Sequence, residues 1–161
     1  MRSRLVVLTA VLALCATTAN AEPKGRWWSG WGQGVTEYGF NDGMGSEIYI
    51  ACTDSPTPND KNATSIRVSV KGVDPAPGSE VVFIVGQDSF SFVYDRKDNL
   101  IATASHVDAS NFYALWEAII GGSSLNLMIT DRIGNKHMKT FPLKGSAKAL
   151  GSEACKTDFA R

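Results

Sequence analysis

The sequence predicts a mainly β fold, an antiparallel β-sandwich or strongly bent sheet of about seven or eight strands with one covering helix. Along most of the chain apolar and polar residues alternate, and Gly, Pro, Asn and Asp interrupt the alternation at short intervals. This rhythm is typical of short antiparallel strands that bury one face. Only the stretch at about 108–120 changes to a clear helical period. The fold class therefore rests on the alternation, and the covering helix on its interruption.

The N-terminus predicts a secretory signal peptide over residues 1–21. Two arginines precede an apolar run at 5–14, and Ala19-Asn20-Ala21 fits the small-residue cleavage pattern. A lipoprotein cleaved before Cys15 is the alternative, but the bulky leucine before that cysteine fits poorly. Cleavage after Ala21 leaves 22–161 as a single β-rich domain with no segment long enough to span a membrane. We expect a periplasmic or secreted bacterial protein.

The first half of the mature chain contains four strand-like segments separated by turn residues, and the first three of them alternate. Asn41-Asp42-Gly43 separates the first two and predicts a hairpin. A polar loop over 55–64 follows, and the fourth segment is apolar on both faces, which predicts a central, covered strand. Strands are therefore expected at 35–40, 47–52, 66–70 and 81–85.

The second half continues the pattern on both sides of the helix. Phe90, Phe92 and Tyr94 alternate, a turn follows at 95–99, and 100–104 is expected to return from it as the next strand. After the helix, strands are expected at 125–129 and 137–141 around a turn at 131–135, and a short helical turn at 146–150.

The helical segment shows the spacing i, i+3, i+4, i+7, i+8 that puts apolar residues on one face. Asp108 and Ser110 are the cap candidates, and Gly121-Gly122 is the stop. Trp116 belongs to the apolar face, so we expect it in the core rather than at a ligand. The face consists of Phe112, Leu115, Trp116, Ile119 and Ile120.

Signal cleavage removes one of the three cysteines and leaves Cys52 and Cys155. In an oxidising compartment this pair predicts one disulfide, which ties an early strand to the tail behind the last strand. A pair of buried free thiols is the alternative. No close second thiol or paired histidine accompanies either cysteine, so we expect no metal and no cofactor.

The charge pattern argues against a nucleic-acid partner. Removal of the two arginines of the signal leaves 14 of the 16 basic residues and all 16 acidic residues, which gives the mature chain a net charge of about −2. Lys and Arg are scattered singly rather than clustered on one face, as binding to a phosphate backbone requires.

The C-terminal third carries a family resemblance. The segment Thr140-Phe141-Pro142-Leu143-Lys144-Gly145-Ser146-Ala147-Lys148-Ala149-Leu150, followed by Cys155, resembles the closing motif of small bacterial periplasmic proteins. It is similar to the accessory proteins of type VI secretion (TagO type) and to invasion-associated locus B proteins. The resemblance implies a periplasmic β-sandwich with a non-enzymatic role at the envelope, and it carries over no site residues.

Catalytic motifs are sparse. His106 and His137 are the two histidines, and no Gly-x-Ser-x-Gly elbow is present. Both histidines are expected to be exposed polar residues rather than a catalytic dyad. The acid pairs Asp95/Asp98 and Asp54/Asp60 fall in predicted turns, where aspartate is common for backbone reasons.

The least ordinary segment places Trp27, Trp28 and Trp31 within five positions, separated by serine and glycine. Two interpretations stay open. The tryptophans close the open end of the sheet as a plug, or they form an exposed aromatic platform that binds a partner. They are the candidate binding residues, with an envelope protein or a cell-wall glycan as the expected partner.

Three functions remain compatible with these observations. We expect a non-enzymatic binding or accessory protein of the bacterial cell envelope, with a link to a secretion system implied by the resemblance. An inhibitor or immunity protein against a cell-wall hydrolase or toxin is the alternative. A hydrolase that uses an unrecognised acidic pair is the third.

Overall fold

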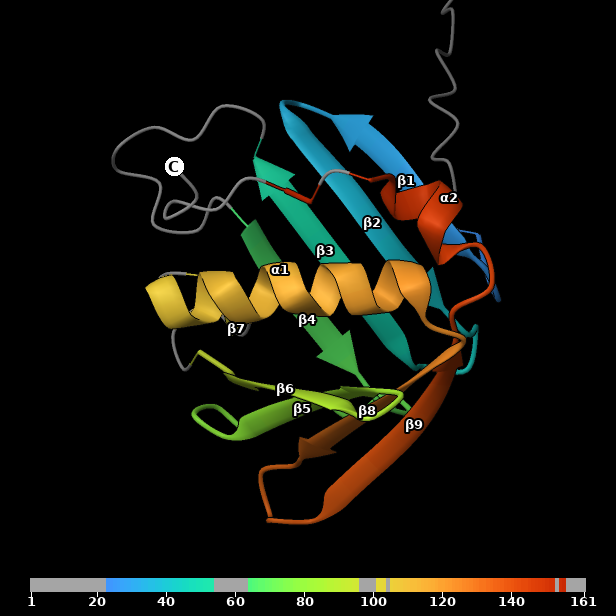
Figure 1. Cartoon of the computed structure of the whole chain (residues 1–161). Helices are drawn as coiled ribbons and strands as arrows, with labels where there is room; N and C mark the ends of the chain where they lie inside the picture. Colours follow the sequence, from blue (N-terminus) through green and yellow to red (C-terminus); the bar gives the residue numbers. More distant parts are fainter. Residues whose placement is uncertain (1–22, 54–63, 96–100, 104, 153, 156–161) are drawn as a thin grey trace, which may run out of the picture.

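The structure is a computed structural model that describes residues 23–53, 64–95, 101–103, 105–152 and 154–155. The described chain forms two antiparallel sheets and two helices (Figure 1). This confirms the predicted mainly β fold. The predicted signal peptide with Cys15 and most of the polar loop lie outside the described residues. The elements are β1 (Trp27–Gly32), β2 (Val35–Asn41), β3 (Glu47–Thr53), β4 (Thr64–Ser69), β5 (Glu80–Val85), β6 (Asp88–Val93), β7 (Ile101–Ala102), α1 (His106–Gly121), β8 (Ser124–Thr130), β9 (Lys136–Pro142) and α2 (Ser146–Leu150). The strand orders of the two sheets are β1-β2-β3-β4-β7 and β6-β5-β8-β9.

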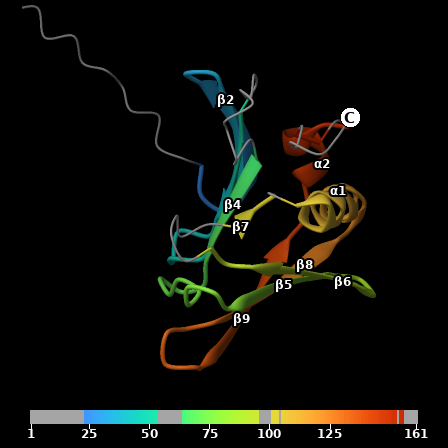
Figure 2. The same cartoon turned by 90° about the vertical axis from the view of Figure 1, so that its left-hand side faces the viewer.

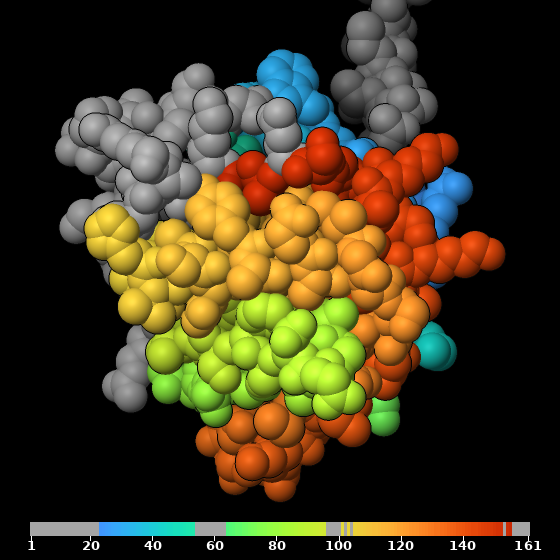
Figure 3. Space-filling model, in the orientation of Figure 1, coloured from blue at the N-terminus to red at the C-terminus, as the bar shows by residue number. Residues whose placement is uncertain are grey.

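The two sheets lie at an angle to each other, and α1 lies in that angle (Figure 2). Trp116 of α1 is 1% exposed, as expected of a core residue, and its ring meets Tyr38 of β2 edge to face with centroids 5.1 Å apart. The same helix contacts β5 and β6 of the other sheet. Because the helix buries its apolar face against both sheets, one core serves the whole domain. On the outside, α2 and the β5–β6 hairpin flank α1 (Figure 3).

The predicted hairpin and the predicted central strand are present. β2 and β3 pair around the Asn41-Asp42-Gly43 turn, where the side chains of Asn41 and Asp42 accept hydrogen bonds from the amides that follow. β5 lies between β6 and β8, and Val81 and Phe83 are fully buried. A strand with neighbours on both sides and both faces covered needs a continuous apolar run, which explains its sequence.

One strand pairing differs from the prediction. The segment after β6 does not return along that strand; β7 pairs instead with β4 of the other sheet, through Ser65↔Ala102 and Ile66↔Ile101. Ile101 is fully buried there. A lone buried isoleucine signals a core position but does not specify which sheet it joins.

The helix begins two residues before the predicted range, and its cap is Ser105 rather than Asp108 or Ser110. Ser105 has extended backbone angles, and its hydroxyl accepts a hydrogen bond from the Asp108 amide at 3.0 Å. The same hydroxyl donates to the Asp108 carboxylate at 2.6 Å. Asp108 therefore completes the cap from inside the first turn, where a carboxylate also complements the helix dipole.

Long-range bonds hold the two sheets and the tail together. Cys52 of β3 and Cys155 form the predicted disulfide; their Cα atoms are 5.6 Å apart, and the two residues are separated by 103 positions in sequence. Lys139 of β9 forms an ion pair with Asp42 at 2.8 Å, which joins the second sheet to the β2–β3 turn. The Ser146 hydroxyl donates to the Ile119 carbonyl at 2.7 Å, so α2 is fixed to the end of α1.

Candidate binding site on the tryptophan strand

The three clustered tryptophans lie on a strand, β1, that the alternation did not predict. β1 pairs with β2 from Trp27↔Phe40 to Gly32↔Val35. The two residues between the strands, Gln33 and Gly34, have φ of 53° and 79°, as a two-residue type I′ hairpin requires. The glycines inside β1 mask the strand signal, because glycine weakens strands. The Gln33-Gly34 dipeptide is the feature of the sequence that could have indicated the hairpin.

Trp27 is the buried member of the cluster. Its side chain is 6% exposed, its ring lies 5.8 Å from Phe40, and its indole Nε1–H donates to the Pro142 carbonyl at 2.8 Å. Pro142 ends β9, so this bond links the edge of the first sheet to the edge strand of the second. Trp27 therefore has the placement that the plug interpretation requires.

Trp31 lies on the same side of β1, because side chains alternate along a strand. It is nevertheless 71% exposed. The β1–β2 turn forms the upper end of the sheet in Figure 1, beyond α2. An indole there presents most of its surface to solvent, which is the placement that the platform interpretation requires of Trp31.

Trp28 points to the outer face of the five-stranded sheet, away from α1, and is half-buried. Glycine stands opposite it in β2: a Cβ at Gly39 would lie 3.0 Å from the indole Cζ2 and 2.9 Å from the Ile48 carbonyl oxygen. A Cβ at Gly30 would also touch the ring, at 3.8 Å from Cζ3. The indole therefore lies over two positions without side chains. Its buried Nε1 has no hydrogen-bond partner among the described residues.

Polar groups surround this indole on the outer face. The ring of Tyr49 lies 6.2 Å from that of Trp28 at 46°, and the Tyr49 hydroxyl donates to Glu37 Oε1 at 2.5 Å. Arg67 stands opposite Tyr49 in β4 and is exposed. We call Trp28, Glu37, Tyr49 and Arg67 the outer aromatic face.

The histidines are placed differently from each other. His106 begins α1 and is exposed, whereas His137 is half-buried and its Nε2 lies 2.8 Å from Asp131 Oδ2. The hydrogen bond from His137 is the main cause that lowers the pKa of Asp131 to about 2, and the amides of Ile133 and Asn135 act in the same direction. Asp131 thereby organises the β8–β9 turn, so the histidine–aspartate contact has a structural role here. Of the predicted acid pairs, Asp54, Asp60 and Asp98 lie outside the described residues.

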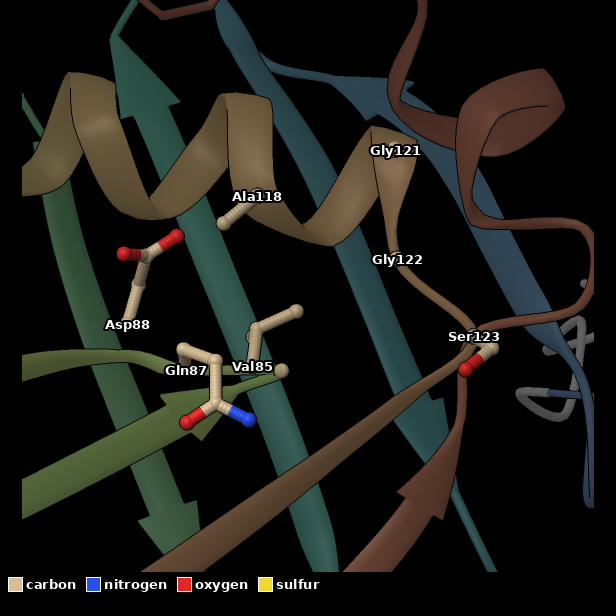
Figure 4. Close-up of a pocket in the computed structure, with 8 residues that line it drawn as sticks. Val85, Gln87, Asp88, Ala118, Gly121, Gly122 and Ser123 are labelled. Atoms are coloured by element: carbon tan, nitrogen blue, oxygen red, sulfur yellow. The ribbon is translucent and has the colours of Figure 1, made fainter.

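A surface pocket lies between the β5–β6 turn and the C-terminal end of α1 (Figure 4). Its volume is about 580 Å³. Asp88 is the one titratable side chain among its lining residues, and it points toward the helix in Figure 4. A single carboxylate supplies no acid–base pair, so the residues that line this pocket offer fewer groups for binding or catalysis than the outer aromatic face. The lining residues are Val85, Gly86, Gln87, Asp88, Ala118, Gly121, Gly122 and Ser123.

Two further features are absent from the described residues. In the part of the chain that the structure describes, no group of three or more His, Cys, Asp or Glu residues is placed to hold a metal ion. Neither described helix has the length and apolar content needed to cross a bilayer.

Two antiparallel sheets around one helix, closed by a disulfide, define a small mainly β domain. Residues 25–150 match the model of the YfjT family, and the chain belongs to this family. The match runs from the residues just before β1 to the end of α2. Neither a curated protein nor a solved structure matches the chain. The resemblance to the TagO type and to invasion-associated locus B proteins stays a prediction.

Proposed function

We propose that this chain is an exported, non-enzymatic binding protein of the bacterial cell envelope. Its binding surface is the β1–β2 hairpin, which carries Trp28 on the outer face of the five-stranded sheet and Trp31 on the opposite face. The observation that carries the proposal is the exposure of Trp31, 71%, on a hairpin whose other end is anchored by Trp27. An exposed tryptophan on a supported strand offers a large contact area at little entropic cost, which is typical of binding surfaces.

Export is the second part of the proposal. The signal sequence over 1–21 supports it, and a disulfide between Cys52 and Cys155 suits an oxidising compartment. Cell fractionation followed by intact-mass measurement tests this part. We expect a chain that begins at residue 22, two mass units lighter than the reduced form. A chain that carries acyl groups on Cys15 would contradict it.

Binding is tested by passing envelope extract over the immobilised exported chain and identifying retained components by mass spectrometry. Trp31→Ala should reduce retention, whereas Met44→Ala should not. Met44 is a suitable control because it is 74% exposed and lies in the turn at the opposite end of β2. Equal retention by both variants and the unchanged chain would count against the tryptophan surface.

An inhibitor or immunity function is the second candidate, and the shape of the hairpin favours it. A short, tightly closed hairpin with an exposed indole near its turn is suited to enter the cleft of an enzyme. Recovery of a cell-wall hydrolase or a toxin in the same experiment, with loss of its activity on addition of the chain, would support this candidate over an accessory role.

A further inference from the structure

We infer that the outer aromatic face, formed by Trp28, Glu37, Tyr49 and Arg67, is a subsite for a glycan chain. The inference rests on the proposed binding function and names its ligand class. It starts from the orientation of the Trp28 indole, which lies over Gly30 and Gly39. A ring supported in this way presents a face rather than an edge, and the apolar face of a sugar ring stacks on such a surface.

The carboxylate of Glu37 supplies the polar part of the subsite. Its Oε1 accepts the hydrogen bond from Tyr49, so the position of the carboxylate beside the aromatic rings is fixed. A fixed carboxylate accepts hydrogen bonds from ligand hydroxyls. The guanidinium of Arg67, one strand further along, donates to ligand oxygens.

The register extends this subsite across the sheet. One row runs Trp28, Gly39, Tyr49, Arg67 over strands β1 to β4. The next row places Gly30, Ala51 and Ser65 beside Glu37, so a strip of small residues borders the aromatic row. Four strands span about 14 Å between the outer two, which is enough for a short oligosaccharide.

Charge favours a glycan over a nucleic-acid ligand. Within the outer aromatic face the carboxylate of Glu37 is balanced by the guanidinium of Arg67, and the neighbouring row adds the single carboxylate of Glu47. This low net charge matches an uncharged, hydroxyl-rich ligand better than a polyanion.

The experiment uses the oxidised chain purified from the periplasm of an expression host. Its probes are insoluble peptidoglycan sacculi, tested by co-sedimentation, and the β-1,4-linked tetramer of N-acetylglucosamine, tested by calorimetry and tryptophan fluorescence. We expect binding of both probes, with Trp28→Ala weakening the affinity about tenfold or more. Trp28→Phe should retain most of it, because it keeps a stacking ring.

Two further variants separate chemistry from folding. Glu37→Gln should weaken binding several-fold while the melting temperature stays close to that of the unchanged chain. Met138→Ala provides the matched control, because Met138 is 63% exposed in β9, a strand of the other sheet, and its loss should leave binding unchanged.

The outcomes decide between the inference and the function on which it rests. No binding of either probe, or equal binding by Trp28→Ala and the unchanged chain, overturns the glycan subsite. If envelope proteins are still retained in that case and Trp31→Ala releases them, the binding function stands with a protein partner. If nothing from the envelope is retained either, both proposals fail.

Discussion

Trp27 and Trp31 lie four residues apart on one strand and on the same side of the sheet, yet one is 6% exposed and the other 71%. The difference comes from what stands opposite each ring. Trp27 faces Phe40 and the end of β9, where the Pro142 carbonyl accepts its indole N–H. Trp31 lies beside the β1–β2 turn, at the other end of the hairpin. We call these the anchored end and the exposed end of the hairpin.

The comparison shows that the plug and the platform are not alternatives for the whole cluster. One tryptophan closes the core, and the same strand then carries a second one into solvent. A buried indole with its N–H satisfied stabilises the fold, whereas an exposed indole contributes little to stability and is available for contacts. Four changes test this division, from the largest expected effect to the smallest.

Trp27→Ala is expected to have the largest effect, a loss of about 3–5 kcal/mol in the free energy of unfolding, because it opens a cavity in the core. Urea titration measures it. Trp27→Phe is the matched control: it keeps a ring and removes the hydrogen bond to Pro142, which should cost about 1 kcal/mol. A Trp27→Ala variant as stable as the unchanged chain would mean that the end with Trp27 is not anchored.

Loss of the disulfide tests what holds the exposed end. Thr36 pairs with Trp31 on one side and with Cys52 on the other, so the bond to Cys155 lies two strands in from the exposed indole. Cys52→Ser and Cys155→Ser should each cost about 2–5 kcal/mol, and the double variant should cost no more than either alone. Thermal unfolding measures the losses. Additive losses would show that the two sulfurs act separately.

Much of the fold could be predicted because its strands carry strong local signals. Residues 35–40 and 47–52 alternate around an Asn-Asp-Gly turn, and both became strands of one hairpin. The partner of β7 could not be predicted, because pairing with β4 depends on where the chain crosses between sheets rather than on local residues. The cap at Ser105 lies outside the predicted helix, because the apolar period that indicates the helix is clear only from Phe112 onward.

The candidate site was predictable in composition but not in arrangement. Three clustered tryptophans indicate a special segment, yet their burial depends on β9 and on Gly39, which are distant in sequence. The involvement of Glu37 and Tyr49 was missed, because two ordinary alternating strands give no sign that these side chains meet. The register alone brings them beside Trp28.

The ion pair between Asp42 and Lys139 tests the anchored end through pH. Burial by itself raises the pKa of Asp42, but the Lys139 ammonium and the amides of Ser46 and Met44 outweigh it and hold the pKa well below the ordinary value. In the unfolded chain an aspartate binds a proton near pH 3.9, whereas the folded Asp42 stays ionised at that pH. The stability that ionised Asp42 contributes is therefore complete above about pH 5 and is lost as the pH falls below 4.

Asp42→Asn should cost about 1–2 kcal/mol in the free energy of unfolding at pH 7. Its urea midpoint should fall less between pH 5 and pH 3 than that of the unchanged chain; an identical fall would remove Asp42 as the cause.

Trp31→Ala is expected to have the smallest effect on stability, within about 0.5 kcal/mol, because 71% of the side chain is already in solvent. The same change should weaken binding to the envelope partner by about 1 kcal/mol or more. An exposed indole at a binding surface stabilises the complex but not the free protein. Urea titration and binding to the retained partner, measured on the same sample, separate the two effects. A loss of stability comparable to that of Trp27→Ala would mean that both ends of the hairpin belong to the core. The division between anchored and exposed ends would then fail, and the proposed binding surface would lose the observation that carries it.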